Sequence, residues 1–84
     1  MNIPNQNQAK NMRFTPVDAT GLESIGYAPA SRQLYIKFRN NLPTLYFDNV
    51  PGFRYEGLLA APRKDAYYKT FIENQFLANQ VKIA

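Results

Sequence analysis

The sequence contains no cysteine and no histidine. Without cysteine, the chain has no disulfide framework and no thiolate chemistry. Without histidine as well, it lacks the usual zinc ligands and the usual general base at neutral pH. Its carboxylates are scattered, with no close pair and no Asp-x-Asp loop of the kind that binds calcium. We therefore expect no metal, no cofactor and no catalytic site.

Long apolar runs are also missing. No stretch approaches the ~18 apolar residues of a membrane span, and no signal-peptide pattern is present. We therefore expect a cytoplasmic protein that has no membrane partner.

The composition is that of one small domain. The 84 residues are 45% apolar and 19% charged, which is typical of a globular chain. Such a chain buries only ~60–65% of the surface of its unfolded state, so we expect a thin margin of stability. Ten Lys and Arg residues against six Asp and Glu residues give a net charge of +4. This excess favours polyanionic partners.

The chain divides into a leader, a domain and a tail. Residues 1–11 are rich in Asn and Gln and bury too little surface to offset their ordering entropy, so we expect a flexible leader. Residues 12–77 form the predicted domain, and residues 78–84 form the tail. From Leu77 onward the sequence has no clear period, and we expect these last residues to fray.

Alternation of apolar and polar residues predicts an antiparallel hairpin. Gln33–Arg39 is the clearest strand, with Leu34, Ile36 and Phe38 on one face and polar or tyrosine side chains on the other. Thr44–Asp48 is the returning strand, because the connection is short enough for a hairpin.

Two helices and a further short strand complete the prediction. Gly26–Ala28 is a strand candidate, and Phe14–Val17 is expected to be extended because of its proline. One helix is predicted between Pro51 and Ala61, and a second begins at Asp65. Their apolar stripes are Tyr55, Leu58 and Leu59 in the first, and Tyr68, Phe71, Ile72 and Phe76 in the second. The expected fold is α+β, a small three-stranded antiparallel meander followed by two C-terminal helices packed on one face.

Several short motifs occur in a family-like order from about Met12 to Phe76. In order, they are Val17, Ile25-Gly26-Tyr27, Leu34-Tyr35-Ile36-Lys37-Phe38, Val50-Pro51, Tyr55, Leu58-Leu59-Ala60-Ala61, Tyr67-Tyr68 and Ile72. This pattern resembles the KTSC domain, named for the C-terminus of some lysyl-tRNA synthetases and also found as free-standing bacterial and phage proteins. The resemblance implies a binding module without an established activity. The synthetase association implies RNA as a partner.

The sequence departs from that family pattern at five places. Asn40-Asn41, with extra length through Pro43, stands where the family has an asparagine-glycine turn. Asp18 and Ala19 stand where the family has two serines, and Leu45-Tyr46-Phe47 stands where it has Y-x-Y. Arg63-Lys64-Asp65 replaces Ser-x-Gly, and Glu73 replaces an arginine. The roles of these motif residues in the family therefore do not transfer directly to this chain.

One candidate binding surface is the polar face of the predicted hairpin. It would carry rings beside cations, and we call it the basic–aromatic face: Arg32, Tyr35, Lys37, Arg39 and Tyr46. Single-stranded RNA or DNA binds such faces because bases stack on rings while phosphates meet Lys and Arg. The alternative is an ordinary solvated sheet face, since aromatic residues are enriched in strands whatever their function.

A second candidate lies before the last helix. Arg63, Lys64 and Tyr67 could contact an anion or a protein partner. A specific phosphate loop is disfavoured there, because the segment has no glycine and Asp65 would compete as the helix cap.

Two functions therefore remain open for a non-catalytic module. The first is binding of RNA or other single-stranded nucleic acid. The second is binding of a bacterial protein through exposed tyrosines, as an adaptor or inhibitor of phage or mobile-element origin. The sequence does not indicate the oligomeric state.

Overall fold

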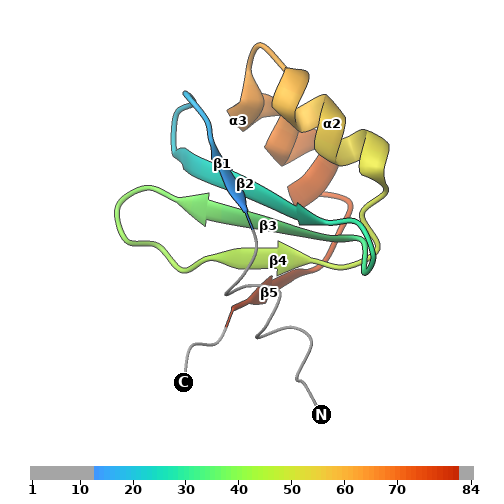
Figure 1. Cartoon of the computed structure of the whole chain (residues 1–84). Coiled ribbons are helices and arrows are strands. Elements are labelled where there is room, and N and C mark those ends of the chain that lie inside the picture. The colour runs from blue at the N-terminus through green and yellow to red at the C-terminus, as the bar shows by residue number, and fades with distance from the viewer. Residues whose placement is uncertain (1–12, 82–84) are drawn as a thin grey trace.

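The computed structural model describes residues 13–81, which form an antiparallel sheet with helices on one of its faces (Figure 1). The elements in chain order are β1 (Phe14–Pro16), β2 (Leu22–Ala28), β3 (Gln33–Phe38), β4 (Leu45–Phe47), α2 (Gly52–Ala60), α3 (Lys64–Tyr67), η1 (Tyr68–Glu73) and β5 (Ala78–Gln80). The predicted leader, residues 1–11, and the last part of the tail, residues 82–84, lie outside the described residues.

The sheet is a meander of five strands, in the order β1-β2-β3-β4-β5. The α+β class and the antiparallel sheet with two helical segments are confirmed, but the prediction of three strands is wrong. β1 was expected only as an extended segment and was not counted in the sheet, and β5 was missed because Ala78–Gln80 contains no large apolar residue that could reveal an alternating pattern. The prediction that the C-terminal segment frays is also wrong for Ala78–Gln80, because this segment pairs with β4.

The central hairpin sets the two faces of the sheet. β2 pairs with β3 through Ile25↔Ile36, and β3 pairs with β4 through Leu34↔Phe47. All four of these side chains are fully buried, at 0% exposure. They point toward the helical layer, so the predicted apolar face of the hairpin is confirmed at its centre.

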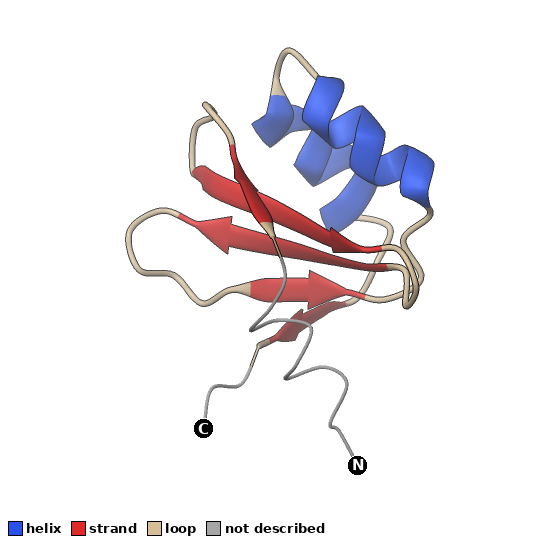
Figure 2. Ribbon diagram, in the orientation of Figure 1, coloured by secondary structure: helices blue, strands red, loops and turns tan. Residues whose placement is uncertain are grey.

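The helical layer closes this apolar face (Figure 2). α2 begins directly after Pro51, as predicted, and contributes the buried Leu58. The second helical segment has α geometry in α3 and then changes to the wider π geometry in η1, which contributes the buried Tyr68 and Ile72. Phe76 lies beyond the end of η1, so the predicted second stripe is shorter than expected.

The two helical segments pack closely at one glycine. A Cβ atom added at Gly57 would overlap the hydroxyl oxygen of Tyr67 and lie 2.8 Å from its Cζ. The Tyr67 ring is itself packed against Phe71, with 4.7 Å between ring centroids. Gly57 therefore allows α2 to approach the Tyr67 ring.

We expect Gly57→Ala to destabilise the protein by ~1 kcal/mol, because the overlap outweighs the gain in helix propensity. Gly52→Ala is the matched control in the same helix, because a Cβ atom there meets nothing within 4 Å. Urea unfolding of both variants measures the difference. Equal free energies of unfolding for the two variants would contradict this account of the packing.

Tyr68 is a titratable group inside the core. Its ring makes edge contacts with Phe38 and Phe47, at centroid distances of 5.6 and 6.1 Å. Burial, and secondarily the nearby Glu73 carboxylate, raises the pKa of Tyr68 from 10.0 to about 12. The folded state therefore holds this phenol in its neutral form.

Alkaline pH is expected to weaken the fold through Tyr68. The stability that its raised pKa contributes is fully present below the unfolded value of 10.0 and is lost as pH rises through about 12. Tyr68→Phe, which cannot ionise, should show a smaller fall in urea midpoint across this window. An identical fall in the parent protein and the variant would contradict the assignment.

Candidate nucleic-acid interface

A row of residues crosses all five strands on the face opposite the helices. The pairing register aligns Phe14 with Gly26, Gly26 with Tyr35, Tyr35 with Tyr46, and Tyr46 with Asn79. Side chains of paired residues on antiparallel strands stand on the same face of a sheet. We call Phe14, Tyr35 and Tyr46 the aromatic row.

The rings of the aromatic row contact one another in sequence. Tyr35 and Tyr46 are stacked, with centroids 5.5 Å apart and planes at 27°. Phe14 meets Tyr35 edge-on at 6.3 Å. These two rings belong to β1 and β3, and they meet across β2 because Gly26, the residue between them in the register, carries no side chain.

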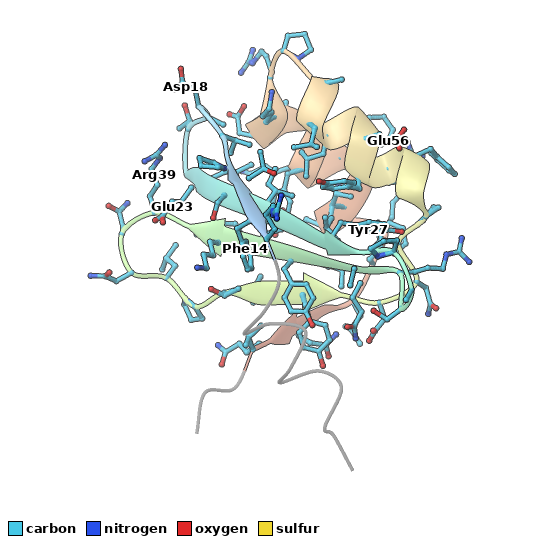
Figure 3. The ribbon with its side chains drawn as sticks, viewed as in Figure 1. Phe14, Asp18, Glu23, Tyr27, Arg39 and Glu56 are labelled. Carbon is cyan, nitrogen blue, oxygen red and sulfur yellow. The ribbon has the colours of Figure 1, made fainter. Side chains whose placement is uncertain are left out.

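A cation lies beside the row. The Lys37 ammonium is 4.5 Å from the centroid of the Phe14 ring, close enough for a cation–π interaction. Phe14, labelled in Figure 3, was missed as a site residue. The signal that could have found it is its position in the extended Phe14–Val17 segment, but only strand pairing brings it to Lys37.

The prediction of an exposed Tyr35 is wrong. Its side chain is only 1% exposed, because the rings of Phe14 and Tyr46 contact it from the adjoining strands. Gln33, predicted on the same solvent face, is 6% exposed. Around Tyr35, the side chains that remain accessible are those of Phe14 and Tyr46, which are half-buried, and Lys37, which is exposed.

Hydrogen bonds fix the buried part of this face. The Tyr35 hydroxyl donates to Gln33 Oε1 at 3.1 Å, and Gln33 Nε2 donates to Asp48 Oδ1 at 2.8 Å. Burial, with smaller contributions from Tyr46 and Asp48, raises the pKa of Tyr35 above its usual 10.0. Tyr35 thus supports its neighbours as a neutral, hydrogen-bonded ring.

The two arginines of the predicted face lie away from the aromatic row. Arg39 donates from Nε to the Ala19 carbonyl at 3.5 Å and from Nη2 to the Val17 carbonyl at 3.4 Å. Its side chain therefore lies against the β1–β2 loop. Arg32 lies in the turn before β3, at the opposite end of that strand, with a φ of 57°. Of the five predicted residues, Tyr35 and Tyr46 belong to the aromatic row and Lys37 lies beside it.

The second predicted group also divides. Arg63 and Lys64 line a polar hollow together with Arg39, and Lys64 Nζ donates to the Ala61 carbonyl at 2.9 Å. Tyr67 instead belongs to the helical layer, where it packs against Phe71. The three residues therefore do not form one site.

The described residues offer neither a metal-binding cluster nor a membrane-spanning helix. Within residues 13–81, no group of three or more carboxylates lies close enough together to hold a metal ion. Over the same range, no helix is long and apolar enough to cross a membrane.

Comparison with known proteins agrees with this architecture. The family model described as the KTSC domain matches residues 19–76. The chain is also similar to the crystal structure of a KTSC domain protein from Yersinia pestis, with a TM-score of 0.79 and 30% sequence identity over 84% of this chain and 99% of that chain. No curated protein matches the chain. The family model and the solved structure confirm the resemblance in the sequence motifs, and the chain belongs to the KTSC domain family.

Proposed function

We propose that this protein is a small non-catalytic module that binds single-stranded RNA or DNA. The contact surface is the side of the sheet away from the helices, at Phe14, Lys37 and Tyr46. The observation that carries the proposal is the aromatic row, in which three rings adjoin across strands and a lysine ammonium lies 4.5 Å from the first ring.

The physical argument is the complementarity of this surface to a flexible polyanion. Unpaired bases present flat π-faces that stack on aromatic side chains, and each stacked base contributes ~1–3 kcal/mol. Lys37 adds a positive charge beside the stacking position, and the net charge of +4 attracts the strand at long range. Tyr35 takes no part in direct contact, but it holds the ring of Tyr46 at a fixed angle.

The arginines extend this surface at its two ends. Arg32 and Arg39 are seven residues apart along β3, which corresponds to roughly 23 Å of extended chain. One nucleotide cannot reach both, so they would contact phosphates at opposite ends of a longer strand. Affinity should therefore rise with oligonucleotide length until both ends are reached.

The test is an NMR titration of the protein with mixed-sequence single-stranded oligonucleotides at about 50 mM and about 200 mM salt. Tyr46→Leu keeps apolar contact with Tyr35 but removes the stacking ring, so affinity should fall about tenfold. Lys37→Gln should weaken oligonucleotide binding. It should also reduce the slope of log affinity against log salt concentration by ~1.

Lys69→Gln is the matched charge control, because Lys69 is exposed in η1 on the helical side of the sheet. It should leave affinity close to that of the parent protein. The proposal fails if the resonances of Phe14 and Tyr46 do not move at low salt. It also fails if Lys37→Gln and Lys69→Gln behave alike.

One specific observation favours protein binding as a second candidate function. Phe53 on α2 is 66% exposed. The neighbouring Arg54 guanidinium lies 5.2 Å from the Phe53 ring centroid and 4.5 Å from that of Phe71. No ion pair within residues 13–81 involves Arg54. A partner with a carboxylate beside an apolar side chain would complement this ring-held guanidinium.

This second candidate predicts a protein partner that persists after nuclease treatment and at raised salt. Phe53→Ser should abolish its stoichiometric recovery, whereas Leu42→Ser should retain it, because Leu42 is similarly exposed at 58% but lies in the β3–β4 loop. If both variants reduce recovery of the partner equally, the partner does not bind through Phe53 on α2. A partner whose binding disappears with nuclease would instead favour nucleic acid.

A further inference from the structure

A polar hollow separates the β1–β2 loop from the α2–α3 connection. It has a volume of about 470 Å³, within the range of small-molecule sites. Its charged and hydroxyl-bearing lining residues are Asp18, Thr20, Arg39, Arg63, Lys64 and Asp65. Asp18 and Arg39 are labelled on the same side of the molecule in Figure 3. The hollow thus brings together charged side chains from three separate parts of the chain.

Two of the three cations, Arg39 and Lys64, already donate hydrogen bonds to backbone carbonyls. Arg39 is held by the carbonyls of Val17 and Ala19, which engage its Nε and Nη2 and leave Nη1 for another acceptor. Lys64 is held by the carbonyl of Ala61, which takes one of its three N–H groups. The Lys64 hydrogen bond is the short one, so its ammonium loses little further rotamer entropy when a ligand binds.

The charges of the hollow do not neutralise one another. Within residues 13–81, no ion pair joins Arg39, Arg63 or Lys64 to Asp18 or Asp65, although all five line the same space. Three cations face two carboxylates, so the hollow has a net positive charge. The cations and the carboxylates are both available to a ligand.

We propose that this hollow binds a phosphate monoester on a hydroxyl-bearing carrier, such as a pentose phosphate. A phosphate has enough acceptor oxygens to engage two guanidinium groups and an ammonium, whereas a single carboxylate is satisfied by one arginine. The carboxylates of Asp18 and Asp65 then accept hydrogen bonds from the hydroxyl groups of the carrier. The volume exceeds what a phosphate alone requires and leaves room for the carrier.

Apart from Arg39, which also lies at one end of the proposed nucleic-acid surface, this site is separate from that surface. Phe14, Lys37 and Tyr46 do not line the hollow, so binding at one place does not require the other. The same phosphate chemistry occurs in a free sugar phosphate and at the terminal phosphate of a nucleic-acid strand. A test with ribose 5-phosphate and with 5′-phosphorylated and unphosphorylated oligonucleotides distinguishes these sources.

The experiment is a heteronuclear NMR titration of the full chain with ribose 5-phosphate, ribose and inorganic phosphate. Ribose 5-phosphate should shift the amides of Thr20 and of Arg63 to Asp65, and ribose should not. Arg63→Gln should weaken the binding of ribose 5-phosphate about tenfold, because it removes one charge-assisted contact.

Two control variants separate binding in the hollow from a general charge effect and from binding at the sheet surface. Lys69→Gln removes the same unit of charge outside the hollow and should leave ribose 5-phosphate affinity unchanged. Tyr46→Leu should also leave it unchanged, although it weakens oligonucleotide binding. Equal weakening by Arg63→Gln and Lys69→Gln would overturn the site, as would the absence of amide shifts. Equal affinity for inorganic phosphate and ribose 5-phosphate would overturn the role of the two carboxylates.

Discussion

The pairing of β3 with both of its neighbours is the constraint on which the structure depends. Ile36 lies opposite Ile25, and Leu34 lies opposite Phe47. These four buried side chains form the apolar face of the sheet on which the helices pack. Because alternate residues of a strand point to opposite faces, the same register places Tyr35 beside Tyr46 on the other side. A shift of one residue would exchange the faces and destroy both the core and the aromatic row.

The aromatic row is also a consequence of chain topology. A meander with short connections places β1 at one edge and brings Phe14 over the small Gly26, where its ring reaches Tyr35. This contact helps to bury Tyr35. The accessible ring surface of the row therefore belongs to Phe14 and Tyr46. The cations separate for a related reason: the two ends of β3 direct Arg32 and Arg39 to different loops. The molecule therefore has a row of adjoining rings on the sheet and a polar hollow at one end.

Sequence reasoning succeeded where the pattern is local and failed where a contact joins distant segments. The alternation of Gln33–Arg39 correctly identified the central strand, and Asn40 and Asn41 after it adopt the left-handed backbone that asparagine tolerates, with φ of 66° and 59°. β1 was expected only as an extended segment and β5 was not expected, because their places in the sheet depend on pairing with another strand, which their own residues do not indicate. The burial of Tyr35 was missed because the rings that cover it come from other strands.

The sequence by itself determined the two-sided hairpin, the positions of the two helical segments and membership in the KTSC family, because periodicity and ordered short motifs are properties of neighbouring residues. Tertiary structure alone decided which charged and aromatic side chains meet. Arg39 joins Arg63 and Lys64 only because the end of β3 lies near the α2–α3 connection. Such contacts depend on the three-dimensional path of the backbone, which no local pattern of residues specifies.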